Sequence, residues 1–152
     1  MDKALQIVAI LVFSTIVISC GARPKGAAYK IQEQMEEKVG ADVQPIIMAV
    51  MPGIYDGVPE TVNLYIVNNT ETEASYPANY TVEKFEDGVW AELPLQINFI
   101  MMMFYIAPQQ VEKEVVSLYT QQVAYTSGSY RIAKFFYLGE EKVYAYGEFI
   151  IE

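Results

Sequence analysis

Short segments of alternating apolar and polar residues follow one another from residue 42 to the C-terminus, and turn-forming residues separate them. In residues 61–68 (TVNLYIVN), Val62, Leu64 and Ile66 fall on one face, and the residues between them fall on the other. A period of two is typical of a β-strand with one buried face. The pattern therefore predicts strands for this part of the chain.

The same alternation recurs near the C-terminus, where residues 129–138 place Tyr130, Ile132, Lys134 and Phe136 on one face. Between two earlier segments, Asp87-Gly88 predicts a tight hairpin, because both turn positions of that type favour positive φ. The segments with a strand pattern are 44–51, 61–68, 79–86, 89–93, 95–106, 111–119, 129–138 and 143–151. We therefore expect an all-β fold, an antiparallel β-sandwich or barrel of seven or eight strands.

The first nineteen residues follow another pattern. A short polar start with Lys3 precedes an almost uninterrupted apolar stretch, which is the layout of a secretory signal. As a transmembrane helix, residues 4–19 would span only about 24 Å, whereas the hydrocarbon core of a bilayer is about 30 Å thick. We interpret residues 1–19 as a signal peptide, and a retained short anchor is the alternative.

The end of this stretch, Val17-Ile18-Ser19-Cys20, resembles the lipobox of bacterial lipoproteins. The resemblance implies that Cys20 receives a diacylglyceryl group and becomes the first mature residue. Two or three acyl chains, such as palmitate, hold a protein stably at a membrane, whereas one chain binds only marginally. An ordinary secreted protein is the alternative, but a lone thiol is a liability in an oxidising compartment.

Residues 20–41 form the predicted tether between Cys20 and a domain at 42–152. Small residues, glycine and proline dominate its first part, as in a flexible linker. Ile31, Met35 and Val39 are four residues apart, which is consistent with a short helix over residues 31–39. An extended stalk remains the other interpretation.

Charge bears on the partners and on the membrane. The chain has 10 Lys+Arg and 19 Asp+Glu, a formal net charge of −9. Such a surface repels nucleic acid and anionic headgroups, so we expect no nucleic-acid partner and a covalent membrane anchor. Gly21 is not the acidic kind of inner-membrane retention signal, so the outer membrane is the expected location if the cell has two membranes.

Three short stretches carry a family resemblance. Residues 61–70 (TVNLYIVNNT), residues 80–90 with their hairpin, and Gly128-Ser129-Tyr130-Arg131-Ile132 resemble segments of bacterial immunoglobulin-like domains. The resemblance covers residues 42–152 and implies an immunoglobulin-like sandwich. It also implies a tyrosine corner at Tyr130, whose hydroxyl would bond to nearby backbone. Trp90 is a plausible large core residue, since only Cys20 exists and no inter-sheet disulfide is possible.

The residue inventory excludes much catalytic chemistry. There is no histidine, and the sole cysteine is Cys20, so His-based triads, thiol catalysis and the common zinc sites are absent. Carboxylates at Glu83, Glu86 and Asp87, or at Glu140 and Glu141, are candidates for an acid/base pair or a calcium site. Their positions on turns and strand faces favour ordinary solvated surface, so we expect no enzyme, cofactor or metal.

Residues 99–106 (FIMMMFYI) are apolar throughout. The commoner explanation of such a run is a strand covered on both faces, with methionines filling gaps. The alternative is an exposed, adaptable partner surface at Met101, Met102 and Met103.

Twelve tyrosines raise a second possibility, because Tyr137, Tyr144 and Tyr146 fall on the last two strands. One interpretation is an aromatic platform for sugars, and the commoner one is tyrosines at strand edges and in the core. We expect a lipid-anchored, non-catalytic cell-envelope protein that contacts other proteins. The alternative is an accessory lipoprotein that binds glycans through surface tyrosines.

Overall fold

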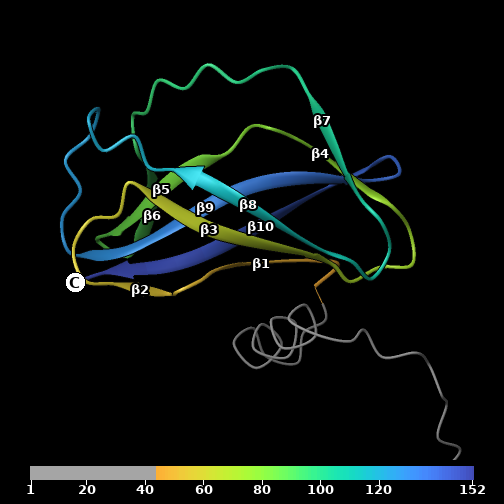
Figure 1. Cartoon of the computed structure of the whole chain (residues 1–152), viewed down its shortest axis with the longest axis horizontal. Coiled ribbons are helices and arrows are strands. Elements are labelled where there is room, and N and C mark those ends of the chain that lie inside the picture. The colour runs from red at the N-terminus through yellow and green to blue at the C-terminus, as the bar shows by residue number, and fades with distance from the viewer. Residues whose placement is uncertain (1–43) are drawn as a thin grey trace, which may run out of the picture.

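A computed structural model describes residues 44–152, and the chain there forms strands joined by turns and extended segments (Figure 1). The predicted signal peptide 1–19, Cys20, the tether 20–41 and the possible helix 31–39 lie outside the described residues. Within residues 44–152, no helix is long and apolar enough to cross a membrane.

The described part contains ten strands, in agreement with the all-β prediction. In chain order they are β1 (Ile46–Val50), β2 (Ile54–Tyr55), β3 (Thr61–Asn68), β4 (Ala74–Pro77), β5 (Thr81–Glu86), β6 (Val89–Glu92), β7 (Met103–Ile106), β8 (Val111–Ser117), β9 (Gly128–Leu138) and β10 (Glu141–Ile151). The expected number of seven or eight was too low, because β2 and β4 are too short to show a clear alternation.

The strands form two sheets. Sheet A has the order β1-β3-β8. Sheet B has the order β2-β10-β9-β4-β7. In addition, β5 pairs with another part of β9, and β6 pairs with β5. All pairings are antiparallel except that of β2 with β10. This arrangement is consistent with the predicted immunoglobulin-like β-sandwich.

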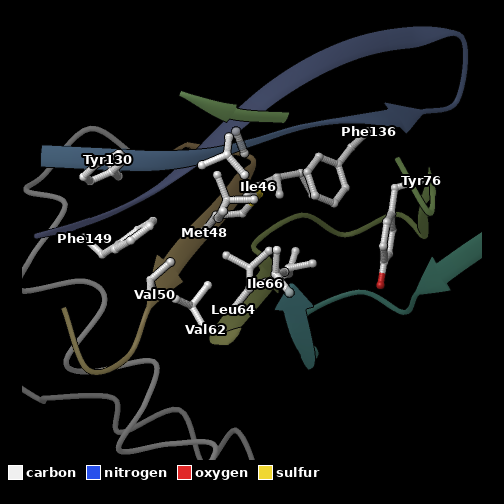
Figure 2. Close-up of a cluster of buried hydrophobic side chains, with 14 of the residues drawn as sticks. Ile46, Met48, Val50, Val62, Leu64, Ile66, Tyr76, Tyr130, Phe136 and Phe149 are labelled. Carbon is white, nitrogen blue, oxygen red and sulfur yellow. The ribbon is translucent and has the colours of Figure 1, made fainter. Parts of the chain in front are cut away.

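One hydrophobic core lies between the sheets, and alternating residues supply it (Figure 2). The inward residues of β3 are Val62, Leu64 and Ile66, as the sequence pattern predicts. Each such side chain contributes about 1.5–3 kcal/mol by leaving water. Gly147 of β10 also faces inward, and a Cβ there would lie 2.8 Å from Leu64 Cδ1. The glycine therefore leaves room for the Leu64 side chain and for β1, whose Ala49 main chain lies 3.6 Å from the same point.

The tyrosine corner at Tyr130 is confirmed. The Tyr130 hydroxyl donates to the Thr126 carbonyl at 2.7 Å and accepts from the Thr126 N–H at 3.0 Å. These bonds satisfy the polar end of a ring that is otherwise in the core.

The Asn-Asn-Thr end of β3 also has a structural role. The buried Asn68 donates through Nδ2 to the Ile106 carbonyl at 3.0 Å and to the Thr72 carbonyl at 2.7 Å. Its Oδ1 accepts from the Thr70 N–H at 3.1 Å. One side chain therefore fixes the turn after β3 and the end of β7, which positions the surface described next.

Candidate functional site

Residues 100–105, the methionine surface, are exposed on the molecule. Met101 is fully exposed, and Tyr105 keeps 62% of its surface accessible. Within β7, only Ile106 is buried. The expectation of a strand covered on both faces is therefore wrong for this run. The physical reason is that, within residues 44–152, β7 is an edge strand whose one neighbour is β4.

The strand predicted over residues 95–106 is also shorter than expected, because only β7 pairs. Residues 93–99 are extended and half-bury every second side chain, but they join no sheet. In Figure 1 they belong to the trace that runs along the top of the view toward β7. Alternation therefore indicated the extended conformation correctly but not the pairing.

The free edge of β7 presents unpaired main-chain groups. The Ala78 N–H donates to the Met102 carbonyl at 3.2 Å, which places Met102 in a hydrogen-bonded pair of the β4–β7 register. Because such pairs alternate along an antiparallel ladder, the N–H and C=O groups of Met103 and Tyr105 point away from β4. No described strand lies on that side. The edge therefore offers two donors and two acceptors beside apolar side chains.

The outer face of sheet B gathers the C-terminal tyrosines. Tyr144 and Tyr146 are 58% and 42% exposed, and they lie beside Phe135 and Ala133 of β9. Tyr137 pairs with Lys142 on the same face. The three candidate residues are thus brought to one surface, as an aromatic platform requires.

The protein's own cations occupy part of that platform. The Arg131 guanidinium lies 4.0 Å from the Tyr146 ring centroid and 4.5 Å from that of Trp90. Lys142 Nζ lies 3.9 Å from the Phe135 centroid and 5.1 Å from the Tyr144 centroid. A sugar that stacks on these rings would compete with the two cations for ring surface.

Trp90 is not the core residue that was predicted. It lies on β6, which pairs only with β5, and its ring packs on Phe85 and Arg131 outside the core. Val82 of β5 reaches the core, but β6 lies beyond β5 and all its residues are exposed or only half-buried. The amino-acid composition cannot predict whether a tryptophan lies in the core or outside it.

An ion pair links the two sheets inside the sandwich. Lys134 Nζ of β9 lies 2.8 Å from Glu114 Oε2 of β8, and only 1% of the Lys134 side chain is exposed. The ammonium group also lies 4.8 Å from the centroid of the Tyr76 ring. Burial lowers the pKa of Lys134, and the Glu114 carboxylate opposes that shift. Burial, reinforced by Glu114, raises the pKa of Tyr76.

Sequence reasoning did not identify this pair as a feature. The signal was available, since Lys134 falls between Ile132 and Phe136 on the apolar face of its strand. A lysine in that position requires a partner inside the protein. The identity of the partner, on a strand 20 residues away, follows only from the fold.

The candidate carboxylates are separated in the structure. The Glu83 carboxylate accepts from Arg131 Nε at 2.5 Å, and Glu86 pairs with Lys84. Asp87 occupies the predicted hairpin turn at φ 51°, whereas Glu140 and Glu141 lie at the exposed β9–β10 turn. Within residues 44–152, no three His, Cys, Asp or Glu side chains are grouped closely enough to hold a metal ion.

The comparison with protein families agrees with this architecture. Residues 42–149 match the model of a family described as a bacterial Ig-like domain. No curated protein matches the chain.

Proposed function

Because the chain belongs to the bacterial Ig-like domain family, we propose that it is a non-catalytic, lipid-anchored cell-envelope protein that contacts another protein through the methionine surface. Bacterial Ig-like domains are typically non-catalytic and suggest a protein-interaction module. Cys20 would carry the acyl chains, and residues 20–41 would separate the domain from the membrane. The outer membrane is the proposed location in a cell with two membranes.

The observation that carries the proposal is the exposure of residues 100–105 along a free sheet edge. Natural proteins usually protect such edges with charge, proline or a covering element, because an apolar edge recruits further strands. Methionine adapts its shape to different apolar surfaces. The unpaired groups of Met103 and Tyr105 are suited to a partner that adds a strand.

In-cell crosslinking of the full chain, followed by detergent extraction, tests the partner surface. Met101→Lys changes a fully exposed side chain, so the fold should survive while the crosslinked partner is lost. Val115→Lys is the matched control, because Val115 is 66% exposed on β8 of the other sheet. Retention of the same partner by Met101→Lys would contradict the proposal.

The anchor is tested separately with Cys20→Ser. We expect this variant to lose incorporation of a labelled fatty acid and to leave the membrane fraction. Incorporation equal to that of the wild type would overturn the assignment of Cys20. Saturable glycan binding by the wild type, lost in Tyr144→Ala and Tyr146→Ala, would support the glycan alternative if no protein partner is captured.

A further inference from the structure

A groove of about 440 Å³ opens beside the unpaired segment 93–99. Alternate apolar side chains of that segment, Leu95, Ile97 and Phe99, form one wall, and Tyr144 and Tyr146 also line the groove. This groove is distinct from the methionine surface, none of whose residues line it.

A break in sheet B forms the floor of the groove. The β4–β9 pairing ends at Ser75, and the β5–β9 pairing begins at Thr81. Phe135 lies between the two and has no strand partner on this side of β9. Pro77, which would stand opposite Phe135, has no N–H to offer the ladder. The sequence therefore interrupts the sheet at this position.

The main chain of Phe135 faces that break. The Val82 carbonyl accepts from the Leu93 N–H at 2.8 Å, so the main chain of Val82 points away from β9. Because these directions alternate along a strand, the N–H and C=O groups of Thr81 and of its partner Ala133 point toward each other. Phe135, two residues after Ala133, directs its N–H and C=O to the same side. The groove floor thus presents a peptide unit of the kind that an added strand recognises.

Two carboxylates stand at the end of the groove formed by β5 and β6. Glu83 and Glu92 are directly opposite each other in the ladder, and both line the groove. Arg131 bonds to Glu83, whereas Glu92 is exposed and forms no ion pair within the described residues. Like charges in such positions repel each other, so a further cation would be favourable there.

Within residues 44–152, every basic side chain already has a partner, so none is available to pair with Glu92. Residues 1–43 contain five basic and five acidic residues, so residues 44–152 carry the whole charge of −9. The five cations of the described part are all engaged: Lys84, Arg131 and Lys134 in ion pairs, and Lys113 and Lys142 over aromatic rings. A cation for Glu92 therefore has to come from outside residues 44–152.

We propose that this groove binds an extended basic segment of a partner protein, with a lysine or arginine at Glu92 and alternate apolar residues against Leu95, Ile97 and Phe99. The two-residue period of the wall and the peptide unit of Phe135, which has no strand partner on that side, fit an extended chain. The two carboxylates, Glu83 and Glu92, favour a cationic side chain at the other end of the segment. The proposal does not depend on the methionine surface.

Trp90 is a suitable reporter, because it is the only tryptophan and packs on Arg131, which holds Glu83 in the groove wall. The detergent-solubilised full chain is titrated with the peptide amide Lys-Val-Lys-Val-Lys-Val and with its Gln-for-Lys analogue. We expect a saturable fluorescence change with the basic peptide, and at least tenfold weaker binding of the analogue. Equal binding of the two peptides, or no saturable change, would overturn the proposal.

Two variants locate the site. Glu92→Gln should weaken binding by about threefold to fivefold, the range for an exposed ion pair of up to about 1 kcal/mol. Ile97→Ser should weaken it at least tenfold, by removing an apolar contact from a segment that lies outside the sheets. Glu71→Gln, the same charge change in the turn after β3, should leave binding unchanged. Equal losses in Glu92→Gln and Glu71→Gln would indicate non-specific attraction and contradict the proposal.

The outcomes separate this site from the methionine surface. A flat titration together with a crosslinked partner that depends on Met101 would overturn only the groove. Saturable peptide binding that depends on Glu92, without any such partner, would support the groove and contradict the proposed role of the methionine surface.

Discussion

Two apolar runs of similar composition have opposite surroundings in sheet B. Residues 132–138 (IAKFFYL) lie in β9, between β10 on one side and β4 and β5 on the other. Residues 99–106 (FIMMMFYI) end in β7, which has β4 as its only neighbour among the described strands. The first run supplies the core even though it contains a lysine, whereas the second remains largely exposed. Position within the sheet therefore decides burial here more than hydrophobicity does.

The largest expected difference in the free energy of unfolding is between alanine variants of one phenylalanine from each run. The rings of Phe136 and Phe104 both contact Tyr76, at centroid distances of 5.1 and 5.5 Å. Phe136 is fully buried, so Phe136→Ala should lower the free energy of unfolding by about 3–5 kcal/mol. Phe104→Ala should cost less than about 1.5 kcal/mol, because its ring is already partly in water. Urea unfolding measures both, and equal losses would contradict the comparison.

The next largest change in stability is expected for variants of the buried Lys134–Glu114 ion pair. Glu114→Gln leaves the Lys134 ammonium buried without its carboxylate, which should cost about 3 kcal/mol. Lys134→Met should cost about 1 kcal/mol or less, because an apolar chain replaces the buried charge and Glu114 reaches water. The same unfolding measurement distinguishes the two, and a larger loss in Lys134→Met would show that the pair itself is strongly stabilising.

Proline substitutions test the two sides of β7. Phe104→Pro removes an N–H directed at β4 and should destabilise the domain by about 2 kcal/mol. Tyr105→Pro removes an N–H directed outward, so the cost should be below about 1 kcal/mol. Tyr105→Pro should nevertheless abolish the crosslinked partner if that partner adds a strand. Loss of folding in Tyr105→Pro would show that the edge is already paired.

The smallest effect is a dependence on alkaline pH. Burial raises the pKa of Tyr76, Tyr80 and Tyr125 above their ordinary value of 10.0, so the folded protein retains protons that the unfolded chain releases. Their stabilisation is therefore complete below about pH 10 and declines above it, by up to about 1.4 kcal/mol per pH unit for each tyrosine.

The lowered pKa of Lys134 acts in the opposite direction, because the unfolded chain then binds more protons below pH 10.5 and stability rises with pH. Burial also raises the pKa of Tyr55, so four tyrosines act against one lysine and we expect a net decline in stability. Tyr80→Phe should show a shallower decline above pH 10, in unfolding curves measured at several pH values. A decline as steep as that of the wild type would contradict the role of Tyr80.

Prediction from sequence was accurate where a strand has a single buried face. The bounds of β3 are those expected, and the inward residues of β9 and the Asp87-Gly88 turn were identified correctly. Prediction failed for Trp90 and for residues 99–106, where burial depends on the presence of a neighbouring strand. The groove at Phe135 forms where residues 79–99, β9 and β10 meet, and no local sequence pattern predicts that these segments lie together.

The sequence by itself determined the all-β class, the alternation of each major strand, the acidic surface and the scarcity of catalytic side chains, because these depend only on composition and on neighbours along the chain. Tertiary structure alone decided that Lys134 meets Glu114 and, among residues 44–152, that β7 has a free edge and that Glu92 lacks a cation. Each of these facts depends on which strands lie side by side, and pairing between distant strands is selected by the packing of the whole core.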